Sequence, residues 1–369
     1  MRKKIACIVG ARPNFMKIAP ILRAMKFHEN LQPILIHTGQ HYDKYQSDIF
    51  FEELGIDPPD IALGIGSGTH AKQTADIMVA MENVLLEANE KSEPFHRVVV
   101  VGDVNSTAAT AIAAVKLHIP VAHVEAGLRS RDRRMPEEIN RVITDAICDM
   151  LLVSEPSGIE NLKREGHPDD QVHLVGNVMI DTLMSQVERA RATGMVEKIG
   201  FKPGQYGVIT LHRPSNVDHA EILESLIEVI RDISAEMPFV FPIHPRTKAR
   251  LESFDLLKKL ESCQNVKCLD PIGYLDFLNL TSQAKVICTD SGGLQEESTA
   301  LLVPCLTLRE NTERPITCSE GTSTLIGNDA AKLKQHLRDV IDGTYKTGKC
   351  PELWDGKASE RIATILAQS

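Results

Sequence analysis

The sequence predicts an α/β protein built of two doubly wound, Rossmann-like domains in tandem. Apolar runs of strand length recur along the chain, and segments with helical periodicity separate them. The runs lack polar–apolar alternation, which is typical of parallel strands that helices cover on both faces. One series comprises 5–9, 33–37, 98–101, 121–124, 150–153 and 172–175, and a second comprises 207–211, 240–243, 266–269, 285–288 and 304–308. Two series of strands predict two sheets, and therefore two domains.

A change in composition near residue 195 predicts the domain boundary. The segment 179–204 begins with a helical pattern and then becomes polar and contains glycine. We therefore expect domains at 1–195 and 196–354, with a ligand-binding cleft between them. The amphipathic segment 355–366 either ends the second domain or returns to the first. We expect the C-terminal helix, 355–369, to complete the first domain.

The overall composition is that of a soluble globular protein. The chain has 369 residues, of which 43% are hydrophobic and 25% charged. A net charge of −9 argues against a broad nucleic-acid surface, and 4% aromatic residues leave few platforms for stacking bases. The apolar run after Lys4 is too brief for a signal peptide, and no run approaches membrane-spanning length. We expect a cytoplasmic protein that binds neither nucleic acid nor membrane.

The cysteines indicate a reducing environment and no metal site. All eight are scattered, mostly within apolar runs, without a CxxC pair or a Cys/His spacing suited to a metal. We expect them to be reduced core residues.

The most informative stretch of the chain is the glycine turn at 289–297. An apolar run, 284–288, leads directly into Ser291-Gly292-Gly293 and a segment compatible with a helix. Two glycines allow a ligand to approach the backbone, and the N–H groups of a first helical turn suit a phosphate. Glu297 lies where a carboxylate accepts hydrogen bonds from ribose hydroxyls. The turn therefore indicates a nucleoside diphosphate, although a capped helix without a ligand would have the same pattern.

Two cations follow the first predicted strand. Arg12 and Lys17 lie in a segment that Pro13 can start as a helix, at the carboxyl edge of the predicted sheet. Ligands bind at this edge in open α/β sheets, so the pair suits a pyrophosphate. The alternative is two solvated surface cations.

Three acids lie at successive strand or helix ends: Asp103, Glu125 and Glu137. Asp103 has the alternative role of a helix cap, and Glu137 that of stabilising a helix N-terminus. Together the three favour proton transfer on a bound sugar or acyl group, because neighbouring acids can raise the pKa of one of them.

Further polar side chains follow the strands of the second domain. His212 and Arg213 come after its first strand and His244 after the next, each placed to bind phosphate or donate a proton. A lone histidine is more often structural. Glu313 and Arg314 follow the strand 304–308, beyond the glycine turn.

The motifs together resemble those of one protein family. The segments GARPNFMK, TGQH, VGDVNST, HVEAGLRS, MPEEINR, TLHRPSN, IHPR, TDSGGLQEE and NTERP span nearly the whole chain. In this order they resemble the non-hydrolysing UDP-N-acetylglucosamine 2-epimerases, which interconvert UDP-GlcNAc and UDP-ManNAc. The resemblance implies a GT-B-like pair of domains, with UDP held mainly by the second, and members are generally homodimers.

The resemblance also implies roles for individual residues. Arg12, Ser291, Gly292 and Gly293 would hold phosphates, Glu297 the ribose, and Arg314 the sugar or a phosphate, with His212 beside the diphosphate. Lys17, Asp103, Glu125 and Glu137 would serve catalysis, with Arg141 as their support. The reaction would be anti elimination of UDP to 2-acetamidoglucal, followed by protonation of C2 from the opposite face and re-addition of UDP. Neither a cofactor nor a metal is needed.

The exact substrate and product stay open. Segments 38–43, 66–70 and 244–247 resemble relatives that act on UDP-2,3-diacetamido-2,3-dideoxy-glucuronic acid, whereas 312–315 resembles the GlcNAc branch. A hydrolysing epimerase, a GT-B glycosyltransferase and a non-catalytic UDP-sugar sensor are further alternatives. Many bacterial members are activated by UDP-GlcNAc through a Gln-His segment and a His-Arg-Arg motif. Here that motif is His212-Arg213-Pro214, so such activation is also open.

Overall fold

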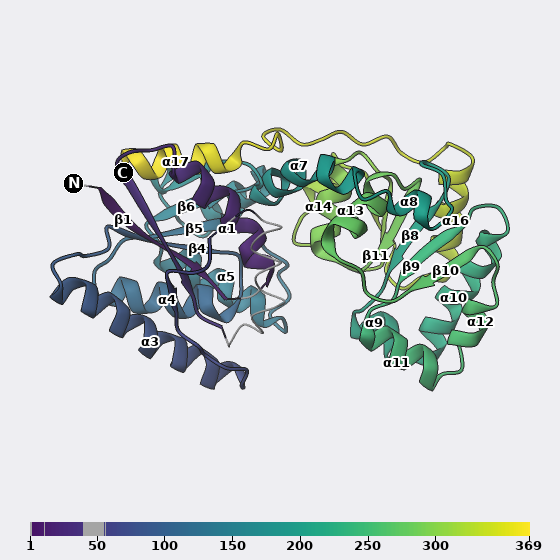
Figure 1. Cartoon of the computed structure of the whole chain (residues 1–369), viewed down its shortest axis with the longest axis horizontal. Coiled ribbons are helices and arrows are strands. Elements are labelled where there is room, and N and C mark those ends of the chain that lie inside the picture. The colour runs from purple at the N-terminus through teal and green to yellow at the C-terminus, as the bar shows by residue number, and fades with distance from the viewer. Residues whose placement is uncertain (1, 11, 40–54, 56) are drawn as a thin grey trace. The chain divides into compact units, whose positions relative to one another are not determined.

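The chain forms two compact units, each built on one parallel sheet (Figure 1). The computed structural model describes residues 2–10, 12–39, 55 and 57–369. The first unit comprises Met1–Thr182 and Glu352–Ser369, and the second comprises Leu183–Pro351. The structure confirms the predicted fold class of two doubly wound α/β sheets.

The described part of the first unit contains a sheet with strand order β3-β2-β1-β4-β5-β6-β7. Its strands are β1 (Lys3–Val9), β2 (Leu31–His37), β3 (Ile61–Ala62), β4 (Arg97–Val101), β5 (Val121–Ala126), β6 (Met150–Val153) and β7 (Val172–Leu174). The helices around it include α1 (Arg12–Met25), α3 (His70–Glu90), α4 (Asn105–Lys116), α5 (Pro136–Ile147), α6 (Pro156–Arg164) and α17 (Ala358–Gln368). The order reverses between β1 and β4, and ligands of open α/β sheets bind beyond such a switch point.

The second unit has a six-stranded parallel sheet with order β10-β9-β8-β11-β12-β13. Its strands are β8 (Gly207–Thr210), β9 (Phe239–Pro242), β10 (Val266–Leu269), β11 (Val286–Thr289), β12 (Cys305–Thr307) and β13 (Ser323–Leu325). Its helices are α8 (Met195–Lys198), α9 (Pro214–Val217), α10 (Ala220–Ser234), α11 (Pro245–Ser253), α12 (Leu257–Glu261), α13 (Tyr274–Ser282), α14 (Gly292–Ala300), α15 (Ile316–Ser319) and α16 (Ala330–Ile341). Here the switch point lies between β8 and β11.

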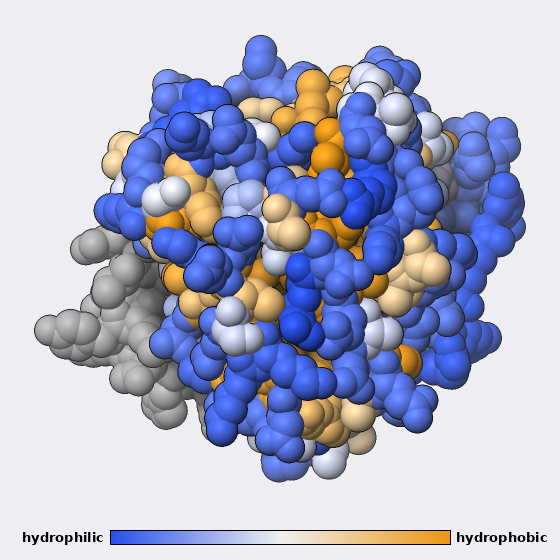
Figure 2. All heavy atoms as spheres, turned by 90° about the vertical axis from the view of Figure 1, so that its right-hand side faces the viewer, coloured by the Kyte–Doolittle hydropathy of each residue, from blue (hydrophilic) through white to orange (hydrophobic). Residues whose placement is uncertain are grey.

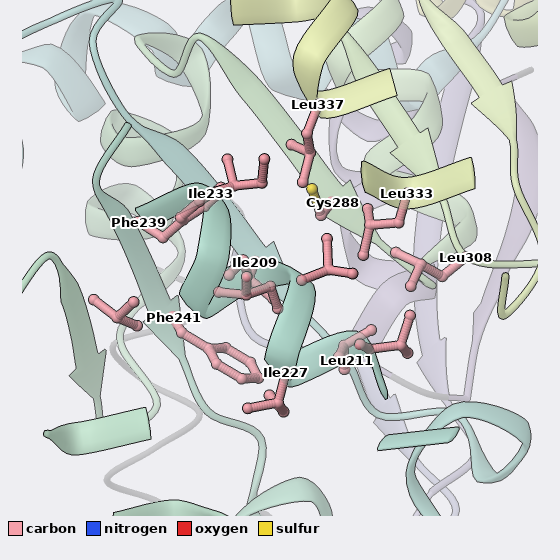
Figure 3. Close-up of a cluster of buried hydrophobic side chains, with 14 of the residues drawn as sticks. Ile209, Leu211, Ile227, Ile233, Phe239, Phe241, Cys288, Leu308, Leu333 and Leu337 are labelled. Atoms are coloured by element: carbon pink, nitrogen blue, oxygen red, sulfur yellow. The ribbon is translucent and has the colours of Figure 1, made fainter. Parts of the chain in front are cut away.

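Helices α10 and α16 cover one face of this second sheet. Leu223, Leu226, Ile227 and Ile230 recur at spacings of three and four residues, which gives α10 a continuous buried stripe. Figure 3 shows side chains of α10 and α16 meeting those of β8, β9 and β11 in one apolar cluster. This core fixes the strands whose carboxyl ends carry the polar residues described below.

The unit boundary differs from the expected residue 195. The helix α7 (Val178–Arg191) runs through the division at Thr182 and Leu183. Asn279 of α13 explains why the polar segment after α7 belongs to the second unit. Its Nδ2 donates to the carbonyl oxygen of Ala190 at 2.9 Å, and its Oδ1 accepts from the backbone N–H of Val196 at 3.0 Å. A contact so distant in sequence leaves no local signal.

The C-terminal segment belongs to the first unit. α17 packs beside α1, and the backbone N–H of Ser359 donates to Oδ2 of Asp181 at 2.7 Å. The indole of Trp354 is buried and donates to the carbonyl oxygen of Ser154. Glu352–Ser369 is thus held to the first unit by both apolar and polar contacts.

One face of the molecule is shown in space-filling view in Figure 2. The face in Figure 2 carries mainly hydrophilic side chains, with hydrophobic ones in narrow patches between them. Within the described parts of the chain, no helix combines the length and apolar composition needed to span a membrane. All eight cysteines are free; Cys7, Cys148, Cys288 and Cys305 are buried, while the other four are only half-buried, so the expectation of core positions is right for four.

Candidate functional site

A buried ion pair lies at the carboxyl end of the first sheet. Nζ of Lys17, on α1, lies 2.5 Å from Oε2 of Glu125, on β5, and the side chains are only 11% and 4% exposed. Gly102 follows β4 with φ +69°, and a Cβ there would lie 3.0 Å from Nζ of Lys17. The glycine therefore leaves the space that the ammonium needs. The structure thus brings together two of the residues that the sequence singled out for catalysis.

Glu125 has an unusual backbone conformation. Its φ is +71°, in the left-handed region that residues other than glycine rarely adopt. The register of β5 against β6 shifts between Val124 and Ala126, so Glu125 is the extra residue of a bulge. Strained residues of this kind persist where the surrounding structure enforces them, and they cluster at functional sites.

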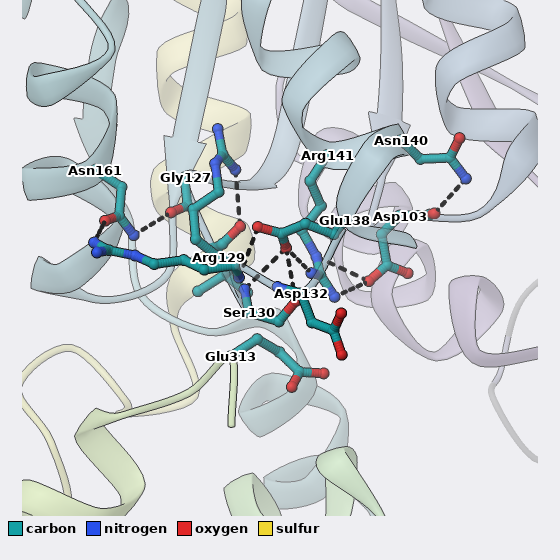
Figure 4. A network of polar contacts seen from close by, with 12 residues as sticks. Asp103, Gly127, Arg129, Ser130, Asp132, Glu138, Asn140, Arg141, Asn161 and Glu313 are labelled. Carbon is teal, nitrogen blue, oxygen red and sulfur yellow. Dashed lines mark hydrogen bonds and ion pairs between the residues drawn. The ribbon is translucent and has the colours of Figure 1, made fainter. Parts of the chain in front are cut away.

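Arg141 binds the carboxylate of Asp103 through two nitrogens (Figure 4). Its Nη2 and Nε lie 2.7 and 3.1 Å from Oδ2 of Asp103, and its Nη1 lies 2.7 Å from Oε2 of Glu138. Asn140 donates to the carbonyl oxygen of Asp103 at 2.9 Å. Arg141 is 3% exposed while Asp103 reaches a pocket, so the guanidinium positions a carboxylate that a ligand can contact.

The pocket at Asp103 also receives Glu137. It has a volume of about 210 Å³ and lies between the N-terminal ends of α4 and α5. Glu137, in the first turn of α5, is half-buried and has no ion-pair partner among the described residues. Asp103 and Glu137 are therefore two carboxylates on one pocket. Arg12 begins α1, but its side chain lies outside the described residues, as do Gln40, His41 and the rest of 40–43.

His123 and Asp145 form a buried support that sequence reasoning missed. Nδ1 of His123 lies 2.6 Å from Oδ1 of Asp145, and Nε2 lies 2.8 Å from the carbonyl oxygen of Gly102. Both nitrogens of the ring therefore have a hydrogen-bond partner. Burial alone would raise the pKa of Asp145, but His123, Arg129 and the N–H of Gly127 hold it below its ordinary value. The only signal in the sequence was the position of His123 two residues before Glu125.

In the second unit, the carboxylate of Asp290 organises the switch point. It accepts from the backbone N–H groups of His212 and Arg213 at 3.0 and 2.9 Å, and from Nδ2 of Asn216 at 3.1 Å. Nδ1 of His212 lies 2.7 Å away. Burial tends to raise the pKa of Asp290, but these donors lower it, so the carboxylate stays ionised. The sequence motif contained Asp290, but we assigned it no role, since its partners lie in the distant segment that follows β8.

The glycine turn forms the expected helix start. Ser291 is the N-cap of α14, its side chain makes no capping hydrogen bond, and its own N–H donates to Oγ1 of Thr289 at 3.0 Å. The first N–H groups of a helix have no partner within the helix. Among the described residues, no atom outside its chain neighbours and the backbone of its own helix lies within 4 Å of the position that a Cβ of Gly293 would take. The turn thus offers donors, positive helix potential and open space to an anion.

An apolar pocket of about 380 Å³ opens beside this turn. Its walls are formed by side chains of the loops after β9 and β10 and of α13 and α14, namely Pro242, Ile243, Pro271, Ile272, Phe277 and Leu294. Glu297 also lines it, and Oη of Tyr274 donates to Oε1 of Glu297 at 3.3 Å. Burial raises the pKa of Glu297 from 4.5 to about 7, with a smaller contribution from Glu296. The apolar walls suit a base, the carboxyl group of Glu297 suits ribose hydroxyls, and the glycine turn suits a phosphate.

His212 and His244 line the apolar pocket, whereas Arg213 and Arg314 do not. His212 and His244 line the apolar pocket with ring centroids 5.6 Å apart, and burial and the charge of His212 lower the pKa of His244. Nε of Arg213 donates to the carbonyl oxygen of Asp290 at 3.0 Å. Arg314 is buried, with Nε 2.6 Å from Oε1 of Glu296, and it does not line this pocket.

A second buried arginine, Arg309, was also missed. Its Nη2 donates to Oε2 of Glu313 at 2.9 Å, while its Nη1 would lie 3.4 Å from a Cβ at Gly292. The positive charge therefore lies beneath the first turn of α14, where it adds to the helix potential. The described residues contain no group of three or more His, Cys, Asp or Glu side chains placed to hold a metal ion.

Comparisons with known proteins show which family the chain belongs to. A model of the UDP-N-acetylglucosamine 2-epimerase family matches residues 23–367. A UDP-N-acetylglucosamine 2-epimerase of Methanocaldococcus jannaschii is 43% identical over 98% of both chains. A UDP-2,3-diacetamido-2,3-dideoxy-D-glucuronate 2-epimerase of Pseudomonas aeruginosa is 40% identical over 99% of both.

A solved structure extends the likeness to three dimensions. The crystal structure of the UDP-GlcNAc 2-epimerase of M. jannaschii in complex with UDP-GlcNAc and UDP is similar with a TM-score of 0.85 and 42% identity. The match covers 99% of this chain and 100% of that one. The chain therefore belongs to the UDP-N-acetylglucosamine 2-epimerase family, whose members are isomerases.

Proposed function

We propose that the protein interconverts UDP-GlcNAc and UDP-ManNAc by elimination and re-addition of UDP. The observation that carries the proposal is the buried Lys17–Glu125 pair at the same switch point as Asp103. A charged pair at 2.5 Å is costly to bury, and it lies where open α/β sheets bind their ligands. Its placement supports proton transfer as the task of the first unit.

The second unit supplies the features that UDP requires. The apolar pocket beside α13 suits a base, and Glu297 suits the ribose hydroxyls. The diphosphate would take the donors of Ser291, Gly292 and Gly293 together with His212, whose ring Asp290 orients. In the reaction, the C1–O bond breaks and UDP leaves with both electrons of that bond. Hydrogen-bond donors that hold the diphosphate therefore also stabilise the negative charge that develops on it.

The chemistry then balances with carboxylates and a lysine alone. A base removes the C2 proton while the C1–O bond to UDP breaks, which gives 2-acetamidoglucal and UDP. A proton returns to C2 from the opposite face, and a phosphate oxygen of UDP re-forms the bond to C1. Removal and return on opposite faces require two acid/base groups, and Asp103, Glu125 and Glu137 supply the candidates.

A second candidate substrate is UDP-2,3-diacetamido-2,3-dideoxy-glucuronic acid. The Pseudomonas aeruginosa relative named for this sugar is 40% identical, close to the 43% of the Methanocaldococcus jannaschii enzyme. The same C2 chemistry applies to both sugars, because each carries an acetamido group on the reacting carbon. The substrates differ at C3 and C6, so relative kcat/KM separates them.

Product analysis tests the proposal. The purified protein is incubated with each UDP-sugar, and the products are separated by ion-exchange chromatography. UDP-ManNAc formed from UDP-GlcNAc, without accumulation of free UDP, supports the proposal. Stoichiometric free ManNAc and UDP would show a hydrolysing enzyme, and turnover of the diacetamido uronic acid alone would establish the second candidate.

The resemblance to the family also supports a homodimer and a supply of ManNAc-type sugars for surface polysaccharide. Sedimentation equilibrium tests the first of these: a mass of a single chain at micromolar concentration would contradict it.

A further inference from the structure

We propose that a further pocket, between α5 and α6 of the first unit, binds a phosphorylated small molecule that has an apolar or aromatic part. The pocket has a volume of about 480 Å³ and shares no lining residue with the pocket at Asp103 or with the one beside the glycine turn. Four arginines and three aliphatic side chains of α5 contribute to its lining. The proposed epimerase reaction gives these residues no task.

The two carboxylates that line this pocket are already paired with cations. Glu165 pairs with Arg129, whose Nη2 lies 2.6 Å from Oε2 of Glu165 and 2.7 Å from Oδ2 of Asp145. Glu138 pairs with Arg141 outside the lining, with 2.7 Å between Oε2 and Nη1. Neither acid is therefore left to neutralise the other arginines of the pocket.

The remaining three arginines of the lining have little or no compensating charge. Among the described residues, Arg133 has no hydrogen-bond or ion-pair partner, and the guanidinium of Arg131 donates only to the neutral Oδ1 of Asn161, at 3.2 Å. Arg164 lies 3.5 Å from Glu160 in an exposed pair of the kind that contributes little. The pocket thus has an excess of positive charge on a chain whose net charge is −9. Guanidinium groups bind phosphate oxygens through paired N–H donors, so a phosphate suits this excess.

The loop that carries Arg131 is held in a strained conformation. The φ of Arg131 is +60°, in the left-handed region that residues other than glycine rarely adopt. The carboxylate of Glu138 accepts from the backbone N–H groups of Ser130 and Arg131, both at 2.9 Å, and from Oγ of Ser130 at 3.0 Å (Figure 4). Strain that the surrounding structure enforces is typical of ligand sites. The loop is therefore fixed before a ligand arrives, which lowers the entropic cost of binding.

The apolar part of the lining lies on α5. Val142 and Ile143 are 43% and 39% exposed, and Ile139 lies one helical turn before them. Aliphatic surface that is open to solvent gains free energy when a ligand covers it. Because this surface lines the same pocket as the arginines, it favours a phosphate ester with an apolar or aromatic group over phosphate alone.

The charge of the pocket also argues against a second copy of the chain as its occupant. In a two-fold symmetric interface, the same patch of both copies lies on the axis. An interface centred on this pocket would therefore bring the unpaired arginines of two copies together, and like charges across an interface are unfavourable. A small anion has the opposite charge and fits the volume of the pocket.

Calorimetric titration with phenyl phosphate tests the inference. Saturating UDP is present, so that the glycine turn of the second unit is not available to the probe. Wild-type protein is expected to bind one phenyl phosphate per chain, and Arg133→Ala is expected to lower the affinity by roughly tenfold, because a hydrogen bond to a charged group contributes on that scale. Arg134→Ala is the matched control, since Arg134 is the next residue, pairs with Asp132 at 2.8 Å and does not line the pocket. Absence of binding, or an equal loss in both variants, would overturn the inference.

A second variant tests the apolar part of the site. Val142→Ser is expected to weaken the binding of phenyl phosphate several-fold and to leave the binding of inorganic phosphate unchanged. Equal effects on the two probes would show that α5 does not contact the ligand. Sedimentation equilibrium of the same variant addresses the alternative occupant: loss of a dimer in Val142→Ser would assign this face to a second copy of the chain and contradict a small-molecule site.

Discussion

The ammonium of Lys17 lies 2.5 Å from a carboxylate oxygen of Glu125, and the pair is nearly excluded from solvent. Lys17 lies on α1, which follows β1, and Glu125 lies on β5; in the strand order, β4 lies between β1 and β5. Each residue places a charge of opposite sign beside the buried charge of the other. The pair therefore links the stability of the first unit to its chemistry.

Removing one member of this pair should cost both stability and activity. Lys17→Met removes the cation that lies 2.5 Å from the buried carboxylate of Glu125, and we expect a loss of about 3–5 kcal/mol in the free energy of unfolding. The double variant Lys17→Met/Glu125→Gln should recover part of that loss, because no uncompensated charge is left. Urea unfolding of the two single variants and the double variant measures the coupling. Additive losses would show that the pair is not coupled.

Arg141→Lys should lower kcat strongly and should have only a small effect on stability. The guanidinium contacts Asp103 through two nitrogens and Glu138 through a third, and an ammonium cannot reproduce this arrangement. Asp103 would then lose its fixed orientation, and we expect kcat to fall by about a hundredfold with KM nearly unchanged. Steady-state kinetics with a thermal unfolding curve checks this. A rise in KM alone would show that Arg141 serves binding.

Gly293→Ala should weaken UDP binding without destabilising the protein. The added Cβ meets no atom within 4 Å, and alanine in a helix is favoured over glycine by up to about 1 kcal/mol. The methyl group would, however, occupy the open space beside the first turn of α14, where we place the diphosphate. Calorimetric titration with UDP and a melting curve test both parts. Unchanged affinity would mean that the diphosphate binds elsewhere.

Glu297→Gln should remove a pH dependence of stability. The pKa of Glu297 is about 7 in the folded protein against 4.5 ordinarily, so the folded state holds its proton more tightly. Protonation therefore contributes stability fully below about pH 4.5, and this is lost as pH rises to about 7, by about 3 kcal/mol. The difference in free energy of unfolding between wild type and variant, measured by urea unfolding from pH 4.5 to 8, should fall in this way as the pH rises. A difference that grows with pH would have the wrong sign.

Much of the fold was predictable because buried parallel strands carry their signal locally. Four consecutive valines make β4 recognisable by themselves, and the glycine turn before α14 combines a strand, a turn and a helix start. By contrast, β3 and β13 were not predicted. β3 has only two residues, and β13 has three, of which two are polar. Neither strand therefore contains an apolar run long enough to recognise.

The sequence predicted which site residues lie at the carboxyl edges of the sheets, but it did not predict which side chains contact one another. The carboxyl-edge rule identified Lys17, Asp103 and His212 from their places after strands. It gave no role to Asp290, whose partners follow another strand, or to Arg309, whose partner Glu313 lies four residues further along the chain. The left-handed backbone of Glu125 was likewise invisible, since a bulge depends on how the neighbouring strand pairs.

The central claim is that the C2 proton of the sugar is exchanged during epimerisation. Proton NMR of UDP-GlcNAc incubated with the protein in D2O follows the configuration and the isotope at C2 together. The account predicts UDP-ManNAc that carries deuterium at C2, with rates strongly reduced in Asp103→Asn and Glu125→Gln. UDP-ManNAc that keeps its original C2 proton would contradict the account.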